Sequence, residues 1–275
     1  MNYPKILTIQ DISCVGQCSL TVALPILSAC GIETAILPSA VLSTHTAGFT
    51  GFTCRDLTDD IPAIAAHWGK EGIQFAAVYT GYLGSTRQID MVADIFTNLC
   101  SAGLKIVDPA MADNGKLYPA FDLEYVEAMK TLRGKADYIV PNITESCFLT
   151  GTEYKTEYDR TYIDTLLAGL TALGCKNVIL TGVSYAPGKT GVVVLENGQY
   201  RYYEHEKLSN SCHGTGDIYA SAFVGALMRG KDAYDAARIA ADYTVSCIRC
   251  TAQLPNHWYG AAFEPVLGQL IDALN

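Results

Sequence analysis

The sequence of 275 residues has little positive charge and no long apolar run. Lys and Arg number 19 against 28 Asp and Glu, which gives a formal net charge of −9, and no cluster of basic residues occurs. Such a surface is poorly suited to neutralising a nucleic-acid backbone, so we expect no nucleic-acid partner. No window approaches the ~18 consecutive apolar residues of a membrane helix, and the first residues lack the basic and apolar stretches of a signal peptide. We therefore expect a cytoplasmic protein that has no membrane partner.

Cysteine pairs at zinc-binding spacing are also absent. The ten cysteines are spread along the chain, and without a secretory signal we expect reduced thiols rather than disulfides. Cys247 and Cys250 form a CxxC pattern, and Cys14 and Cys18 lie four positions apart. Neither pair is matched by a second Cys/His pair, so we interpret both as packing residues.

Apolar runs alternate with amphipathic segments along most of the chain. This alternation is typical of a parallel sheet that helices cover on both faces. Predicted strands lie at 5–10, 33–39, 75–81, 104–109, 136–141 and 177–182, and predicted helices at 17–30, 60–70, 86–102, 122–133 and 158–173. Asn197-Gly198 within 189–206 predicts a hairpin, and three helices near 214–229, 231–252 and 263–273 follow. No repeat or linker interrupts the pattern, so we expect residues 1–275 to form a single domain.

The segment 211–228, SCHGTGDIYASAFVGALM, carries the most specific chemistry. Gly214, Thr215 and Gly216 precede an apolar helical run, and glycines there leave backbone amides and the helix dipole open to an anion. Asp217 would repel a bound phosphate, but it could accept a proton from an alcohol that attacks a γ-phosphoryl group. The pair predicts a small-molecule kinase; the alternative is a capped helix whose first turn carries an acidic residue. Neither a GxxxxGK[ST] loop nor a GxGxxG motif occurs.

GTGD followed by IYASAF, late in an α/β chain, resembles the signature of the ribokinase superfamily, and within it the vitamin B6 (pyridoxal, pyridoxine and pyridoxamine) kinases. Other stretches agree in order: ILTIQD with Gly16 soon after it, LSTHT (42–46), YTGYLGS (79–85), VDPAM (107–111) and VPNITE (140–145). The resemblance covers nearly the whole chain. It implies a three-layer α/β/α sandwich with a mostly parallel central sheet, ATP and Mg²⁺ as cofactors, and a homodimer by analogy.

The resemblance also implies roles for residues of these motifs. Asp217 would be the base that activates the 5′-hydroxyl group of the vitamer, and the amides of Gly214, Thr215 and Gly216 would form the anion hole. For the vitamer ring the candidates are His45, Thr46, Tyr82 and Asp11, the last at the end of the first strand. Without the resemblance, His45 would be interpreted as a solvated loop residue, and Tyr82 as a core residue.

Polar residues follow three of the predicted strands. Asp108, Asn142 and Glu145 come just after strands, at the carboxyl edge where parallel sheets bind ligands. Asp108 and Glu145 are suitable ligands for Mg²⁺. Such an ion is often held through waters and bridges the ATP phosphates. Each residue by itself also has a structural interpretation: Asp108 as a turn residue before Pro109, and Asn142 as a helix cap. Thr181 and Gly182 are expected at the nucleotide-binding edge, with the 189–206 hairpin near the adenine and ribose.

Three positions depart from the family pattern. Asp11 stands where pyridoxal kinases commonly have Ser followed by His, and Gly182 where many relatives carry a Lys. Cys212, before the GTGD motif, lies near an anion-binding helix start, where a thiol pKa can be lowered. One hypothesis is a reversible adduct between Cys212 and the aldehyde of pyridoxal; the other is a thiol that only packs.

We predict ATP-dependent phosphorylation of the 5′-hydroxymethyl group of pyridoxal, pyridoxamine or pyridoxine. The partners would be the small-molecule vitamer, ATP and a second copy of the chain. One alternative is a hydroxymethylpyrimidine kinase of the same superfamily, against which LSTHT and YTGYLGS favour vitamin B6. Another is a non-catalytic vitamer-binding protein, although a pure binder would need no base such as Asp217. The preferred vitamer and a role for a monovalent cation such as K⁺ stay open.

Overall fold

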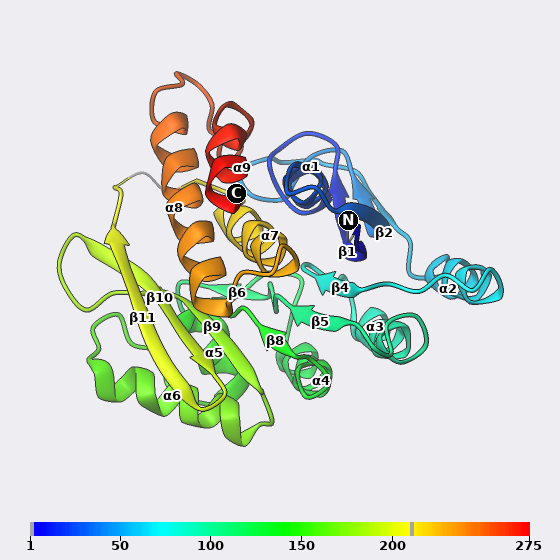
Figure 1. Cartoon of the computed structure of the whole chain (residues 1–275), viewed down its shortest axis with the longest axis horizontal. Coiled ribbons are helices and arrows are strands. Elements are labelled where there is room, and N and C mark those ends of the chain that lie inside the picture. Colours follow the sequence, from blue (N-terminus) through cyan, green and yellow to red (C-terminus); the bar gives the residue numbers. More distant parts are fainter. Residues whose placement is uncertain (1–2, 210–211) are drawn as a thin grey trace.

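A mixed sheet of nine strands forms the centre of the computed structural model, which describes residues 3–209 and 212–275 (Figure 1). The strand order is β11-β10-β9-β8-β5-β4-β1-β2-β3. The strands from β2 to β9 in this order run parallel to one another, whereas β3, β10 and β11 join antiparallel at the two edges. The mostly parallel sheet predicted from the sequence is therefore confirmed. Ser211, the first residue of the GTGD segment, lies outside the described residues.

The parallel strands range from two to ten residues in length. They are β1 (Lys5–Ser13), β2 (Glu33–Leu42), β4 (Ala77–Thr80), β5 (Leu104–Val107), β8 (Tyr138–Ile139) and β9 (Asn177–Val183), and the antiparallel ones are β3 (Cys54–Asp56), β10 (Lys189–Glu196) and β11 (Gln199–Glu206). All four residues of β4 are buried, as expected for a strand covered on both faces. Asn197 and Gly198 both have positive φ, 51° and 73°, so they form the tight turn of the predicted β10–β11 hairpin.

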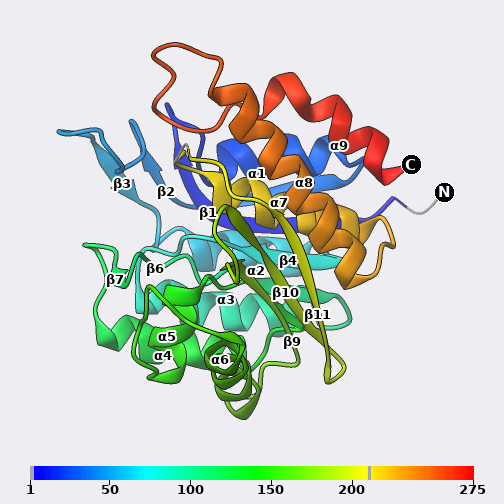
Figure 2. The same ribbon diagram turned by 90° about the vertical axis from the view of Figure 1, so that its left-hand side faces the viewer.

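Helices cover both faces of the sheet, which completes three layers (Figure 2). One face carries α1 (Leu20–Ala29), α7 (Thr215–Met228), α8 (Ala233–Thr251), the short 3₁₀ helix η1 (Glu264–Val266) and α9 (Leu267–Leu274); the other carries α2 (Ile61–Lys70), α3 (Thr86–Asn98), α4 (Leu123–Arg133), α5 (Ile143–Thr150) and α6 (Arg160–Ala172). The buried side chains accordingly divide into two apolar clusters, one on each face of the sheet. Within 3–209 and 212–275, no helix has the length and apolar character that a membrane crossing requires.

Side chains cap several of these helices at their first turn. Ser85, Asp122, Asp159 and Asp232 each accept a hydrogen bond from the backbone amide three residues further on, at the starts of α3, α4, α6 and α8. Such a cap satisfies an amide that has no partner inside the helix. The capped starts agree with the predicted helices to within a few residues.

The sequence analysis missed α5, β3 and a small hairpin of β6 (Ala112–Asp113) and β7 (Lys116–Leu117). Six of the eight residues of α5 are buried, so the helix has no polar face and no 3.6-residue pattern to detect. The helix predicted from residue 17 begins only at Leu20, because Ser19 has a φ of 54° and forms a bridge to Ile12 instead.

Helices α1 and α7 pack closely at a single glycine. A Cβ atom on Gly225 of α7 would lie 2.4 Å from Sγ of Cys30, the residue that ends α1, and 3.1 Å from its Cβ. Gly225 and Cys30 are both buried. The missing side chain therefore sets the distance between α7, which begins at the GTGD motif, and the helix that follows β1.

We expect Gly225→Ala to lower the free energy of unfolding by about 1–3 kcal/mol, the usual cost of overpacking a core. Gly69→Ala is the matched control, because Gly69 lies within α2 with no atom within 4 Å of an added Cβ; it should be neutral or stabilising. Urea denaturation of each variant measures the change. In a Cys30→Ala background the cost of Gly225→Ala should shrink, and an unchanged cost would contradict the proposed contact.

Candidate active site

The GTGD motif forms an open turn at the start of α7. Gly214 has a φ of 77°, and a Cβ atom there would lie 1.7 Å from the backbone oxygen of Gln17, so only glycine fits. Gly216 is exposed, with no atom within 4 Å of the place where its Cβ would be. No described side chain caps this helix start, and the first amides of α7, like those of any helix, have no partners within the helix. The turn has the geometry expected of an anion site.

Asp217 lies in the first turn of α7, directly after the open glycine turn. Its side chain is partly exposed. Burial raises the pKa of Asp217 to about 7, opposed by a hydrogen bond from the Ser19 backbone and reinforced by the charge of Asp11. A carboxylate whose pKa lies close to neutrality can accept a proton at physiological pH and release it again.

Asp108 and Glu145 bring further acidic groups to the same edge of the sheet. Burial, and then the nearby charges of Glu145 and Asp217, raise the pKa of Asp108 well above its ordinary value. Burial likewise raises the pKa of Glu145 to about 7, although backbone hydrogen bonds from Asn142, Met111 and Ala112 oppose the rise. Asp108 therefore lies within electrostatic reach of both other carboxyl groups.

Asn142 and Glu145 also form the capping box of α5. The backbone amide of Glu145 donates to Oδ1 of Asn142 at 2.9 Å, and the amide of Asn142 donates to Oε2 of Glu145 at 2.8 Å. Oε1 of Glu145 accepts a further hydrogen bond from Met111, at 3.1 Å. The interpretation of Asn142 as a helix cap is thus confirmed. The same hydrogen bonds fix the Glu145 carboxylate at the edge of the sheet.

The acidic groups lack a positive partner within residues 3–209 and 212–275. Among the residues that the structure describes, no ion pair involves Asp108, Glu145 or Asp217. The same residues contain no group of three or more His, Cys, Asp or Glu side chains that could enclose a metal ion. Carboxylates that repel one another are suitable ligands for Mg²⁺. This ion keeps several of its waters and needs few protein ligands.

His45 is buried and held in a fixed orientation. Its Nδ1 accepts a hydrogen bond from the Ala47 amide at 3.1 Å, so the ring hydrogen is on Nε2, which donates to the backbone oxygen of Tyr259 at 2.8 Å. A Cβ on Gly16 would lie 2.0 Å from Cδ2 of this ring. The interpretation of His45 as a solvated loop residue is therefore wrong. Thr46, its predicted companion, is exposed.

Asp11 lies within electrostatic reach of both Asp217 and Tyr82. Asp11 is buried and accepts a hydrogen bond from Oγ of Ser13 at 3.1 Å. Burial raises the pKa of partly exposed Tyr82 to about 12, and the negative charge of Asp11 adds to the rise. Because the charge of Asp11 also raises the pKa of Asp217, the two ring candidates Asp11 and Tyr82 and the base belong to one region of the structure.

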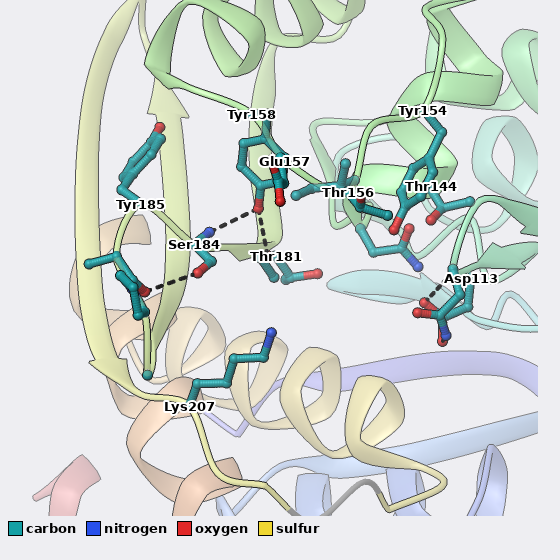
Figure 3. Close-up of a pocket in the computed structure, with 17 residues that line it drawn as sticks. Asp113, Thr144, Tyr154, Thr156, Glu157, Tyr158, Thr181, Ser184, Tyr185 and Lys207 are labelled. Atoms are coloured by element: carbon teal, nitrogen blue, oxygen red, sulfur yellow. Dashed lines mark hydrogen bonds between the residues drawn. The ribbon is translucent and has the colours of Figure 1, made fainter.

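A cavity of about 500 Å³ opens at Asn142, the residue that caps α5 (Figure 3), and its described lining does not include Asp108, Glu145 or Asp217. Asn142, Thr181 and Gly182 line it, as predicted for the nucleotide edge. Thr181 is held there by hydrogen bonds from its amide and its hydroxyl group to the Pro141 oxygen, at 2.9 and 3.3 Å. Gly182 has a φ of 76° and is exposed, so its backbone borders the cavity without a side chain.

Several lining residues escaped the sequence analysis. They include Asp113, Tyr154, Tyr158, Tyr185 and Lys207. The hairpin 189–206 was expected near the adenine and ribose, but the cavity is lined by the turn 184–188 and by Lys207, which flank the hairpin on either side. Pro187-Gly188 was a turn signal visible in the sequence, whereas nothing local marked Lys207.

Cys212 does not have an activated thiol. Burial raises the pKa of Cys212 above its ordinary value, only partly offset by a hydrogen bond with Thr251. Cys212 also packs against the apolar cluster that contains α7 and α8. The hypothesis of a lowered thiol pKa is therefore wrong, and the packing interpretation agrees with the structure.

Comparison with known proteins identifies the family. Residues 28–262 match the phosphomethylpyrimidine kinase family. A protein of that name from Bacteroides thetaiotaomicron, whose crystal structure includes pyridoxal, is 38% identical with a TM-score of 0.91, over 98% of this chain and 96% of the other. Pyridoxal kinase from Lactobacillus plantarum is 31% identical with a TM-score of 0.90, over 98% of both chains.

A curated relative agrees with the solved structures. Pyridoxal kinase from Dictyostelium discoideum is 28% identical over 240 residues, which cover 81% of this chain and 78% of the relative. The family match covers more than half of the chain, and the similarity to the two bacterial structures extends over nearly all of it. The chain therefore belongs to the phosphomethylpyrimidine kinase family, in the ribokinase superfamily that also contains the vitamin B6 kinases.

Proposed function

We propose that the protein is an ATP-dependent kinase that phosphorylates the 5′-hydroxymethyl group of pyridoxal, pyridoxamine or pyridoxine. The observation that carries the proposal is Asp217, with a pKa of about 7, directly after an amide turn that no side chain closes. The similarity to a pyridoxal kinase and to a protein crystallised with pyridoxal supports the vitamer as substrate. The proposal treats residues 1–275 as one kinase domain.

In this proposal Asp217 accepts the proton of the vitamer hydroxyl group as its oxygen attacks the γ-phosphorus of ATP, and ADP leaves. The amides of Gly214, Thr215 and Gly216 donate hydrogen bonds to the phosphoryl oxygens, where negative charge has to be stabilised during transfer. The nucleotide occupies the cavity of about 500 Å³ that Asn142, Thr181 and Gly182 line. In this proposal the phosphates lie on the side of Thr181 and Asn142.

Asp108 and Glu145 would hold Mg²⁺ in this site, in part through water. When bound, the ion would neutralise charge on the ATP phosphates. The contribution of the chain is to keep the Glu145 carboxylate in place through the α5 capping box and that of Asp108 through the Ala110 amide, which donates to Oδ1 at 3.1 Å. Both positions are fixed by backbone hydrogen bonds rather than by flexible side chains.

The vitamer ring is proposed to lie among Asp11, His45, Thr46 and Tyr82. The carboxylate of Asp11 can accept a hydrogen bond from a protonated pyridine nitrogen or from a ring hydroxyl group. Both nitrogens of His45 already have backbone partners, so His45 can offer only its ring face. The exposed hydroxyl group of Thr46 is free to meet a ring substituent.

A hydroxymethylpyrimidine kinase is the second candidate, because the matching family carries a pyrimidine kinase name. Turnover of ATP with pyridoxal, pyridoxamine, pyridoxine and hydroxymethylpyrimidine, each supplied alone, separates the two. We expect ADP formation with at least one vitamer at a kcat/KM above that for the pyrimidine. A faster pyrimidine reaction would favour the second candidate, and no vitamer-dependent ADP would favour a non-catalytic binder.

Four further expectations stay predictions. They are the homodimer, the cytoplasmic location, the use of Mg²⁺ and the involvement of a monovalent cation such as K⁺. Light scattering after size exclusion measures the first, and initial rates at varied Mg²⁺ and K⁺ measure the last two.

We expect Asp217→Asn to lower kcat by about 10² or more, the usual contribution of a general base. The substitution keeps the size of the side chain, so the melting temperature should not fall. A rate within a few-fold of the unaltered enzyme would contradict the role of Asp217 as base.

The pH dependence follows from the raised pKa of Asp217. Below about pH 7 this carboxylate becomes protonated in the free enzyme and cannot accept a proton. We therefore expect kcat/KM to fall toward tenfold per pH unit on the acid side. The residual rate of Asp217→Asn should lack this acid limb; a limb that persists in the variant would assign the titration to another group.

Asp108→Asn should raise the free energy of unfolding at neutral pH by about 1 kcal/mol or more, since it removes a buried charge that Glu145 and Asp217 repel. The folded-state pKa of Asp108 is raised, so the ionised form is disfavoured by folding, and stability in the unaltered protein declines as pH rises through that pKa. Asn can keep the hydrogen bond from Ala110.

Thermal unfolding with and without Mg²⁺ measures the stability of Asp108→Asn and the effect of Mg²⁺ on it. Mg²⁺ should raise the melting temperature of the unaltered protein, because it binds the folded state, and should do so less in Asp108→Asn. Asp94→Asn, at an exposed position on α3, is the control and should change neither. A destabilised Asp108→Asn with the full Mg²⁺ effect would argue against a metal at this site.

A further inference from the structure

The charges around the nucleotide cavity are unbalanced. Among the described residues that line it, Asp113 and Glu157 are acidic and Lys207 is the one cation. The chain as a whole carries a formal net charge of −9. A nucleoside polyphosphate brings several more negative charges, so any cation that faces the cavity has a large effect on binding.

Lys207 is fixed at its backbone and free at its amine. It directly follows β11, and its amide donates to the oxygen of Gly188 at 2.9 Å, which ties it to the turn 184–188. Figure 3 shows its side chain rising from the end of the hairpin with the amine directed into the cavity, on the side of Thr181. The long stem of lysine allows the charge to reach a ligand while the backbone stays still.

Lys207 also lacks a carboxylate partner. Other basic residues are paired: Arg249 with Glu206, Lys176 with Asp137, and Arg201 with Glu196 and Asp232. Over 3–209 and 212–275, no ion pair involves Lys207. Its charge is therefore available to a ligand.

The turn 184–188, to which the Lys207 backbone is bonded, is held by side-chain hydrogen bonds. The hydroxyl group of Tyr158 accepts from the Ser184 amide at 3.0 Å and donates to the Gly182 oxygen at 3.3 Å. Oγ of Ser184 donates to the Lys189 oxygen at 2.7 Å. These bonds hold the turn 184–188, to which the Lys207 backbone is attached, against the end of β9 (Figure 3).

We propose that Lys207 binds the polyphosphate of the nucleotide and supplies the positive side chain of the cavity. The inference rests on the proposed function, since it takes a nucleotide to occupy this cavity. Gly182, which also lines the cavity near the end of β9, offers only its backbone. Lys207 thus contributes to recognition of the phosphates and not of the adenosine.

The test compares the binding of ADP and of adenosine by calorimetry in Lys207→Met, Lys207→Arg and Lys189→Met. Lys189 is the matched control: it is exposed, lies at the same open end of the hairpin on the neighbouring strand, and is outside the cavity lining. We expect Lys207→Met to raise the Kd of ADP about tenfold or more, as loss of a hydrogen bond to a charged group does, with the Kd of adenosine unchanged. Lys207→Arg should recover most of the affinity, and Lys189→Met should match the unaltered protein.

An ADP Kd within about twofold of the unaltered value in Lys207→Met would overturn the inference. Equal weakening of adenosine, or an equal loss in Lys189→Met, would overturn it too, because either points to an effect that is not specific to the phosphates. If the unaltered protein phosphorylates a vitamer while Lys207→Met binds ADP normally, only the inference fails. If the unaltered protein binds ADP but phosphorylates no vitamer, only the proposed function fails.

Discussion

The repulsion among acidic groups at the carboxyl edge of the sheet is the constraint on which the site depends. Asp108 is buried between two other carboxyl groups, Glu145 and Asp217, and burial raises the pKa of all three. In a structure selected for stability alone, such charges would be paired or replaced by neutral groups. Their retention within electrostatic reach of one another suits a site that receives positive charge only together with its ligand.

The chain maintains this costly arrangement through close backbone contacts. The oxygen of Gln17, in the turn after β1, lies so near Gly214 that no side chain fits there, and Gly260 approaches Gln17 from the C-terminal region in the same way. The Gln17 amide also donates to the Tyr259 oxygen at 3.2 Å, the same oxygen that receives the Nε2 hydrogen of His45. Three segments distant in sequence thus fix one another around the start of α7.

The sequence allowed the sheet, the hairpin and the GTGD turn to be predicted, because each is specified locally. Apolar runs mark the buried strands, Asn197-Gly198 adopts the positive φ of a tight turn, and Gly214 begins a helix. Residues whose roles come from tertiary contacts were not predictable in this way. His45 is buried only because Tyr259, more than 200 positions later, accepts its hydrogen bond, and Lys207 faces the cavity only because its backbone is attached to Gly188.

Asp108 connects the two halves of the site electrostatically. Glu145 belongs to the helix that Asn142 of the cavity caps, and Asp217 lies in the first turn of α7, within electrostatic reach of Asp11. Because the interaction between two titrating groups is mutual, positive charge bound at Asp108 also favours the ionised form of Asp217. In the proposed mechanism Asp217 would therefore be most completely ionised when a cation is bound on the nucleotide side of the site, so that occupation of one half would prepare the other for proton transfer.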